Sequence, residues 1–163
     1  MVIKKAFANE LNVIRSIAHR TWPVTYSGIL SKEQLAYMLD MMYSVEALNQ
    51  NLDDGVHFIV AEENGEYFGF GGLEHRYKNE NRTHIHKIYV LPEAQGRNIG
   101  RLLMESMQRA AIDSGSEQIT LNVNRNNKAL HFYERLGFEI LETVDIAIGN
   151  GYLMEDYVMG KRL

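Results

Sequence analysis

The chain of 163 residues contains no cysteine. Disulfide bonds, thiolate zinc sites and catalysis by a cysteine nucleophile are therefore excluded. The sequence also has no run of 18 apolar residues, and residues 1–14 lack the apolar stretch of a signal peptide. We therefore expect a cytoplasmic protein that does not interact with a membrane.

Linkers rich in proline, glycine or serine are absent, as are low-complexity tracts and internal repeats, so we predict a single domain over residues 1–163. The net charge of −4 argues against binding to nucleic acid, because phosphate backbones attract basic surfaces. A negative charge of this size mildly favours a cationic small substrate, although it usually serves solubility.

The pattern of apolar and polar residues predicts an α/β fold with a mixed sheet and helices on both faces. The predicted strands span residues 2–7, 56–62, 66–74, 83–91, 118–123, 138–148 and 152–159. Predicted helices start near residues 9, 31 and 44 and span 99–114 and 126–136. We expect Pro23 to interrupt the first helix, and we expect Asn64-Gly65 and Asn150-Gly151 to form hairpin turns.

One segment has the sequence pattern of an anion site. A predicted strand ends at Pro92, and a short loop with Gly96 and Gly100 then opens a long helix. Such a turn leaves backbone N–H groups unpaired at the positive end of the helix dipole, and Arg97 and Arg101 add charge. The segment lacks the Gly-Lys-Ser/Thr of a P-loop and the glycine spacing of a dinucleotide fold. An ordinary strand-to-helix turn with solvated arginines remains the alternative.

The pattern Gln95-x-x-Asn98-x-Gly100 resembles the Gln/Arg-x-x-Gly-x-Gly/Ala motif of the GCN5-related N-acetyltransferases, the GNAT family. Asn98 stands where that family usually has glycine, and asparagine tolerates left-handed backbone geometry best among the other residues. Residues 122–138 are similar to a second family segment, Asn-x-x-Ala-x-x-Phe-Tyr-x-x-x-Gly-Phe. Residues 21–26 and 155–163 resemble the PaiA-like polyamine acetyltransferase branch.

This resemblance implies the GNAT fold, a mixed and mostly antiparallel sheet of six to seven strands with helices on both faces. It implies acetyl-CoA as co-substrate, with its pyrophosphate on backbone amides and no metal. The expected contacts to acetyl-CoA are Ile88, Tyr89, Val90, Leu91, Gln95, Gly96, Arg97, Asn98, Ile99, Gly100, Arg101, Asn124 and Asn127. Backbone N–H groups near Val90 and Leu91 are expected to polarise the thioester carbonyl, and Asn127 can instead cap a helix.

Acetyl transfer to an amine needs a base, because only about one lysine-like amine in a thousand is neutral near pH 7.4. His84 and His86 lie two residues apart on a predicted strand and so share a face. Similar strands in arylalkylamine acetyltransferases carry a histidine pair at this distance from the loop. Packing residues are the alternative, and a metal site would need a third ligand that the spacing does not offer. Glu74 can act through a water.

Tyr133 occupies the family position beside the CoA sulfur, which implies a general acid. The alternative is a core aromatic residue, which is the role we expect for Phe132, since adjacent helix positions point about 100° apart. Trp22 and Tyr26 are expected to line the acceptor pocket or to belong to the core.

We therefore predict an acetyl-CoA-dependent N-acetyltransferase that acts on a primary amine of a small molecule, polyamine-like or other, by direct attack in a ternary complex. A protein N-terminal or lysine acetyltransferase and a non-catalytic acyl-CoA sensor are the alternatives. We expect a monomer or a homodimer.

Overall fold

The structure, a computed structural model, describes residues 1–163. The strands are β1 (Val2–Ala6), β2 (His57–Glu63), β3 (Glu66–His75), β4 (Arg82–Val90), β5 (Gln118–Asn124), β6 (Glu139–Ala147) and β7 (Leu153–Arg162). The α-helices are α1 (Leu11–Thr25), α2 (Lys32–Tyr43), α3 (Val45–Asp53), α4 (Ile99–Asp113) and α5 (Ala129–Arg135). Three short 3-10 turns are η1 (Ala8–Glu10), η2 (Tyr77–Asn79) and η3 (Pro92–Ala94).

All seven strands form one sheet in the order β1-β2-β3-β4-β5-β7-β6. Every neighbouring pair is antiparallel except β4 and β5, which are parallel. The predicted mixed, mostly antiparallel sheet is thus confirmed, at the upper end of the expected strand number. The Asn64-Gly65 turn joins β2 to β3, and both of its residues have positive φ, as such hairpin turns require.

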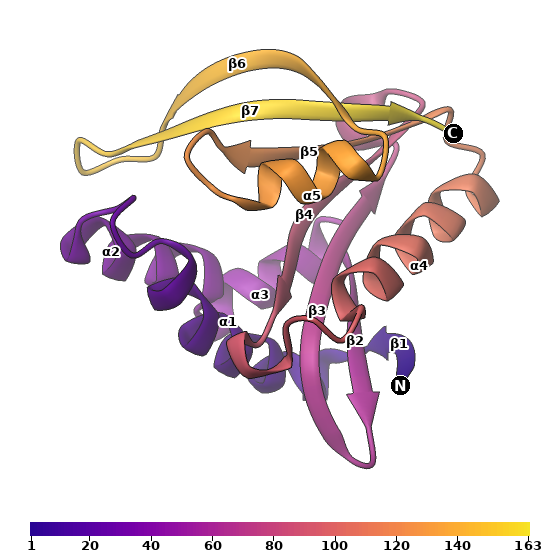
Figure 1. The fold of residues 1–163 in the computed structure, drawn as a ribbon, viewed down its shortest axis with the longest axis horizontal. Coiled ribbons are helices and arrows are strands. Elements are labelled where there is room, and N and C mark those ends of the chain that lie inside the picture. Colours follow the sequence, from indigo (N-terminus) through magenta and orange to yellow (C-terminus); the bar gives the residue numbers. More distant parts are fainter.

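The parallel pair of strands is incomplete. Residues 82–85 of β4 pair with residues 118–121 of β5, but the remainder of β4, up to Val90, does not pair with the remainder of β5, up to Asn124. In Figure 1, β3 and β4 accordingly cross β5 and β7 at a steep angle. The two strands therefore part beyond Ile85 and Leu121 and open the sheet in its middle.

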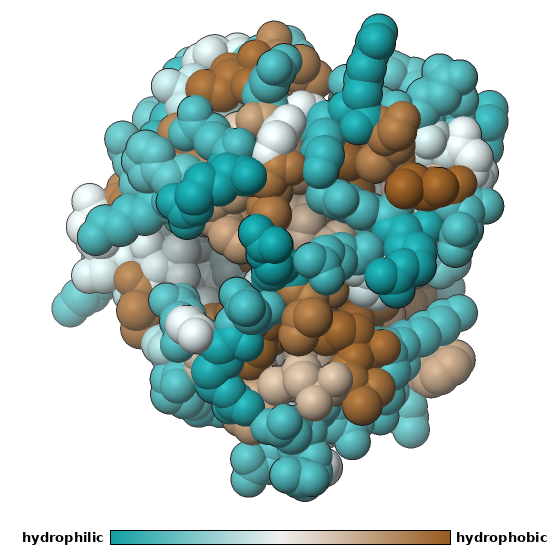
Figure 2. All heavy atoms as spheres, turned by 45° about the vertical axis from the view of Figure 1, so that its right-hand side comes forward, coloured by the Kyte–Doolittle hydropathy of each residue, from teal (hydrophilic) through white to brown (hydrophobic).

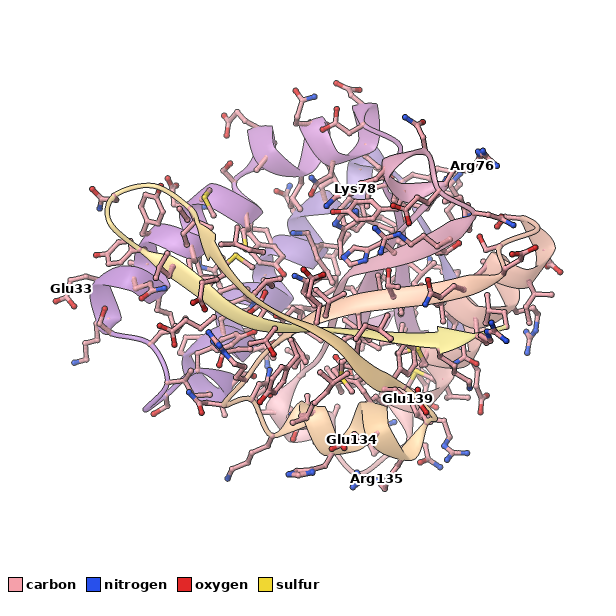
Figure 3. All side chains as sticks on the ribbon, turned by 90° about the horizontal axis from the view of Figure 1, so that it is seen from above. Glu33, Arg76, Lys78, Glu134, Arg135 and Glu139 are labelled. Atoms are coloured by element: carbon pink, nitrogen blue, oxygen red, sulfur yellow. The ribbon has the colours of Figure 1, made fainter.

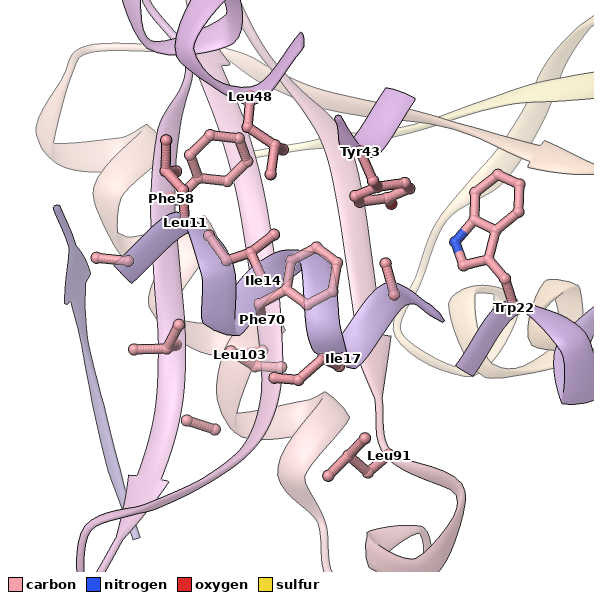
Figure 4. Close-up of a cluster of buried hydrophobic side chains, with 14 of the residues drawn as sticks. Leu11, Ile14, Ile17, Trp22, Tyr43, Leu48, Phe58, Phe70, Leu91 and Leu103 are labelled. Atoms are coloured by element: carbon pink, nitrogen blue, oxygen red, sulfur yellow. The ribbon is translucent and has the colours of Figure 1, made fainter. Parts of the chain in front are cut away.

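Helices cover both faces of the sheet. Phe70 packs edge-on against Tyr43 of α2, whereas a Cβ on the adjacent Gly71 would lie 2.9 Å from the Met107 sulfur of α4. Because successive strand residues point to opposite faces, α2 and α4 lie on opposite sides. Figure 4 shows Phe70 and Tyr43 in the larger of two apolar clusters, together with Ile14 and Leu48 from α1 and α3.

The first helix differs from the prediction, because α1 runs through Pro23 and ends at Thr25. Pro23 lies on the exposed side of the last turn of α1. Because it has no N–H, it removes one backbone hydrogen bond near the end of the helix. The neighbouring Thr21 and Trp22 are buried and hold this turn against the core. Tertiary packing thus outweighs the local cost of the proline.

Two predicted helix starts are confirmed in detail. The Ser31 and Ser44 side-chain oxygens accept hydrogen bonds from the N–H groups of Gln34 and Ala47, each at 3.1 Å. The helix after Ser44 extends through Asp53. The last helix is shorter than predicted and begins at Ala129, because the preceding residues form side-chain-bonded turns.

Figure 2 shows hydrophilic side chains over most of one face, with separate apolar patches between them. None of the helices combines the length and the apolar character that crossing a bilayer demands.

Candidate active site

A β-bulge at His86 shapes the middle of β4. Gly72 pairs with Lys87 and Leu73 with Ile85, so His86 is the extra residue. Ile85 packs in the apolar cluster that contains Met107 of α4, yet the Lys87 ammonium lies 4.4 Å from the centre of the Tyr43 ring of α2. The bulge thus turns Ile85 and Lys87, two residues apart, to opposite faces of the sheet.

A cavity of about 950 Å³ occupies the opening between β4 and β5. The last paired residues, Ile85 and Leu121, line its apex. On the α4–α5 side it is lined by the loop before α4 and by α5, and on the other side by the α1–α2 connection, residues 26–29. The cavity therefore passes through the sheet and has two chemically distinct ends.

The N-terminus of α4 offers an anion site at one end. Gln95 N–H bonds the Pro92 carbonyl and Leu102 N–H bonds the Asn98 carbonyl, but no backbone N–H of residues 96–101 has a backbone partner. Gly96 and Asn98 have φ of 84° and 63°. Asn98 thus adopts the left-handed geometry expected of it. Unpaired N–H groups at the positive end of a helix suit a pyrophosphate.

Exposed cations surround this end of the cavity: Arg101, Lys128 and Arg135. Figure 3 shows Arg135 on the outer side of α5. Arg97, expected to contact acetyl-CoA, does not line the cavity. Its guanidinium donates to Glu63 at 2.7 Å and lies over the Phe68 ring. Sequence alone could not anticipate this partner, because Glu63 lies on a distant strand.

Two further expected contacts lie away from the cavity. Leu91 is buried in the core, and its N–H donates to the Phe68 carbonyl at 2.9 Å. We had expected this N–H to polarise the thioester carbonyl, and that expectation is wrong because the N–H is already bonded. Asn124 accepts from the Asn126 N–H and so shapes the loop before α5. Asn127 lines the cavity, and its side chain accepts from the Ala129 N–H at the start of α5. The remaining predicted contacts line the cavity: Ile88, Tyr89, Val90, Gln95, Gly96, Asn98, Ile99, Gly100 and Arg101.

The two histidines share a face, as predicted, but differ in environment. His84 is buried and stacked on Tyr77, with its Nδ1 at 2.7 Å from the Thr120 hydroxyl. Burial lowers the pKa of His84 to about 3. His86 lines the cavity, and its Nε2 lies 3.0 Å from Glu74 Oε1. His84 is thus a packing residue, which was the alternative to a catalytic role for both histidines.

The electrostatics of His86 reflect two opposed influences. Partial burial lowers its pKa, the hydrogen bond and charge of Glu74 partly offset that shift, and the positive charge of the adjacent Lys87 lowers the pKa further. A carboxylate only accepts hydrogen bonds, so the pair places a proton on Nε2 and leaves Nδ1 of the neutral ring as an acceptor. Glu74, which we expected at the substrate, does not line the cavity and is bonded to His86.

Tyr133 and Phe132 both line the cavity. Tyr133 is buried, with its ring 5.4 Å from that of Phe132, and burial raises the pKa of its phenol. Phe132 is only partly buried and would contact a side chain at Gly100 at 3.4 Å. Phe132 packs against the smaller apolar cluster, as expected of a core residue, but it also lines the cavity, whereas Tyr133 is a buried member of that cluster.

Trp22 does not line the cavity, whereas Tyr26 does. The Trp22 ring packs behind Tyr26 and Tyr89 at 4.7 and 5.8 Å between ring centres. Figure 4 shows its indole beside Tyr43, in the core. The Tyr26 and Tyr89 hydroxyls are 2.9 Å apart and border the cavity. Trp22 thus supports, without lining it, the end of the cavity beside the α1–α2 connection.

Sequence reasoning missed three polar residues at this end. Lys87 and Asn122 line the cavity. Asp156 of β7 is buried, accepts from Asn122 Nδ2 at 3.4 Å, and has a pKa raised by burial. A polar residue inside an apolar strand was the available signal for Asn122 and Asp156. Lys87 offered no such signal, because the bulge turns its side chain to the face opposite to the one that strand alternation predicts.

Comparison with known proteins agrees with this geometry. Residues 28–159 match the family model described as an acetyltransferase (GNAT) domain. A spermidine N(1)-acetyltransferase of Thermoplasma acidophilum is 27% identical over 161 residues, 94% of either chain. An uncharacterised N-acetyltransferase of Mycobacterium tuberculosis is 28% identical over 157 residues, which cover 94% of this chain and 98% of that one.

Solved structures share the fold. The crystal structure of the PaiA N-acetyltransferase from Thermoplasma acidophilum in complex with coenzyme A has a TM-score of 0.83 at 24% identity, covering 99% of this chain and 98% of that one. The ribosomal-protein-S18-alanine N-acetyltransferase of Escherichia coli has a TM-score of 0.75 at 18% identity, covering 99% and 92%. The chain therefore belongs to the GNAT family of N-acetyltransferases and uses acetyl-CoA as co-substrate.

Proposed function

We propose that the protein acetylates a primary amine of a small molecule by direct attack in a ternary complex. The observation that carries this proposal is the cavity through the sheet, with the unpaired N–H groups of residues 96–101 at one end and polar side chains at the other. The thioester of acetyl-CoA supplies the electrophilic acyl group. Since the chain has no cysteine, we propose no covalent thiol intermediate.

His86 is the proposed base. Its Nδ1 can take the proton that the amine loses, directly or through a water, while Glu74 holds Nε2–H. The carboxylate also stabilises the imidazolium that forms, so it supports the base in both charge states. Glu74 is thereby a positioning residue.

Tyr133 is the proposed hydrogen-bond donor to the departing sulfur. A raised phenol pKa keeps Tyr133 protonated, so it can donate. Full proton transfer to a thiolate is uphill, because an alkyl thiol has a pKa of about 8.5 and tyrosine one of about 10 before burial. A hydrogen bond that strengthens as charge gathers on sulfur is sufficient.

The end of the cavity beside the α1–α2 connection is the proposed acceptor end, and it favours a small molecule over a peptide. The Tyr37 hydroxyl of α2 donates to the Ile148 carbonyl at 2.7 Å, and Gln34 Nε2 donates to the Leu153 carbonyl at 2.9 Å. These bonds fasten α2 to the connection between β6 and β7, which lies beside α2 in Figures 1 and 3. A peptide needs an open groove, and this contact closes the route between the two elements.

A thiol-release assay with acetyl-CoA and a panel of amino acids, polyamines, aminoglycosides and peptides tests the proposal, with products identified by mass spectrometry. We expect small amines to be acetylated and peptides to be poor acceptors. Preferred acetylation of peptides would favour the protein acetyltransferase. Tight acetyl-CoA binding with no product from any amine would favour the non-catalytic sensor.

A further inference from the structure

We propose that the acceptor is a small primary amine that also carries a carboxylate, and that Lys87 binds this carboxylate. The proposal rests on the function proposed above and names the substrate class of the same site. Three observations support it: the position of Lys87 in the cavity, the lack of a carboxylate partner for it, and the absence of acidic side chains from the cavity wall.

Lys87 lies at the acceptor end. The bulge turns its side chain to the face of α1–α3, where its ammonium lies over the Tyr43 ring. The adjacent residue is His86, and the opposite wall is Tyr26 with the α1–α2 connection. The other cavity cations, Arg101, Lys128 and Arg135, belong to α4, to α5 or to the residue preceding α5, where the phosphates bind. Lys87 is separated from that loop by the remainder of β4, about 10 Å of extended strand up to Val90.

The ammonium of Lys87 has no anionic partner within the protein. Burial lowers the pKa of Lys87 to about 8, and no aspartate or glutamate offsets that shift. It lies over the face of Tyr43, which attracts a cation without neutralising it. A partly buried cation is stabilised when a ligand supplies the missing anion.

The cavity wall contains no aspartate and no glutamate. Glu74 is bonded to His86, and Asp156 lies behind Asn122. A polyamine keeps at least one ammonium after its reacting nitrogen is deprotonated, and that charge would meet Lys87 without a counterion. An amine with a carboxylate reverses this balance, since its anion meets Lys87 while its nitrogen reaches His86.

The test compares free L-amino acids with their amides, for leucine, phenylalanine and methionine, and includes spermidine. The amide keeps the side chain and the amine but loses the negative charge. The amine of the amide has a pKa of about 7.7–8.0, so at pH 7.4 a larger fraction of it is neutral than of the amine of the free amino acid. The intrinsic reactivity of the amine therefore favours the amide. We expect kcat/KM to be at least tenfold higher for the acid of at least one pair.

Variants assign that preference to Lys87. K87M should raise KM for the acid at least tenfold and leave the amide almost unchanged, whereas K87R should retain most of the preference. K32M, which removes an exposed lysine outside the cavity, is the matched control and should alter neither substrate. Acetyl-CoA affinity and melting temperature are measured on each preparation, and K87Q replaces K87M if that variant does not fold.

The outcomes are distinct. Better use of amides or spermidine than of acids by the wild-type protein would overturn the inference while leaving the proposed function intact. An equal loss for acid and amide in K87M would also overturn it and would make Lys87 a base or a structural residue. Failure to acetylate any amine would defeat the proposed function and the inference with it.

Discussion

His86 is the residue whose loss should affect catalysis most specifically through pH. If its Nδ1 takes the amine proton, H86Q should lower kcat/KM about a hundredfold and flatten the acidic limb of the pH profile. His84, bonded to Thr120 outside the cavity, is the matched control. H84Q should keep the acidic limb of the wild type. A flattened limb in H84Q with an unchanged one in H86Q would transfer the role to His84.

Glu74 should influence the same profile through His86. The carboxylate raises the pKa of His86 against the effect of burial, so E74Q should lower that pKa and move the acidic limb to lower pH. We also expect a lower kcat, since the imidazolium loses its counterion. A profile of E74Q that coincides with that of the wild type would remove Glu74 from the proposed proton path. If neither histidine variant has an effect, Glu74 acting through an ordered water becomes the preferred base.

Tyr133 offers a separation of catalysis from packing. Y133F removes one hydroxyl, so it should keep the fold and the acetyl-CoA affinity but lower kcat about a hundredfold or more, because the donor acts mainly in the transition state. The measurements are kcat and melting temperature on one preparation. Wild-type kcat in a stable Y133F protein would contradict the catalytic role, and a joint fall of stability and activity would indicate packing.

At the scale of the element, the start of α4 decides acetyl-CoA binding. G100E places a carboxylate among the unpaired N–H groups and beside Phe132, so it should repel the pyrophosphate. We expect acetyl-CoA affinity to fall at least about tenfold, or roughly 1.4 kcal/mol, by calorimetry.

The matched control is R109E, on the exposed side of the same helix and about 15 Å along it from Ile99. R109E should bind acetyl-CoA like the wild type, because the dipole effect fades beyond the first turn. Equal affinity of folded G100E and wild type would reject the assignment of this loop.

The bulge in β4 is the element that the sequence pattern could not predict. Alternation with period two places Lys87 opposite His86, and the structure places both on one face. A bulge depends on how two strands pair, and no residue type in β4 predicts it. The prediction of the acceptor end was therefore incomplete by the residue that we now propose defines its chemistry.

At the scale of the whole molecule, His84 should contribute to the pH dependence of folding. Its pKa in the folded protein, about 3, lies below its ordinary value of 6.5, so the unfolded chain binds the proton more tightly between these values. Stability should therefore be greatest above pH 6.5 and fall as the pH decreases, by on the order of 1 kcal/mol per unit.

Urea unfolding between pH 7 and pH 5 measures this slope, because ordinary carboxylates remain mostly ionised there. H84Q should reduce it and leave the contributions of His75 and His86, whose pKa values burial also lowers, whereas H131Q, which alters an exposed histidine of α5, should not change it. Equal slopes in wild type and H84Q would show that His84 is not the group that titrates.

The amino-acid sequence by itself determined the α/β class, most element positions and the family. These depend on local signals: apolar periodicity, the Ser31 and Ser44 caps, the Asn64-Gly65 turn, and the spacing of Gln95, Asn98 and Gly100. Each signal acts within a few residues, so it can be recognised without knowledge of the rest of the chain.

Only the tertiary structure decided which side chains meet. It paired Arg97 with Glu63, moved Trp22 and Leu91 into the core, brought Phe132 to the cavity and fastened α2 to the β6–β7 connection. These contacts join residues far apart in the chain, so no local sequence pattern predicts them. The same long-range pairing sets the bulge at His86 and opens β4 from β5, and so it creates the cavity in which the chemistry occurs.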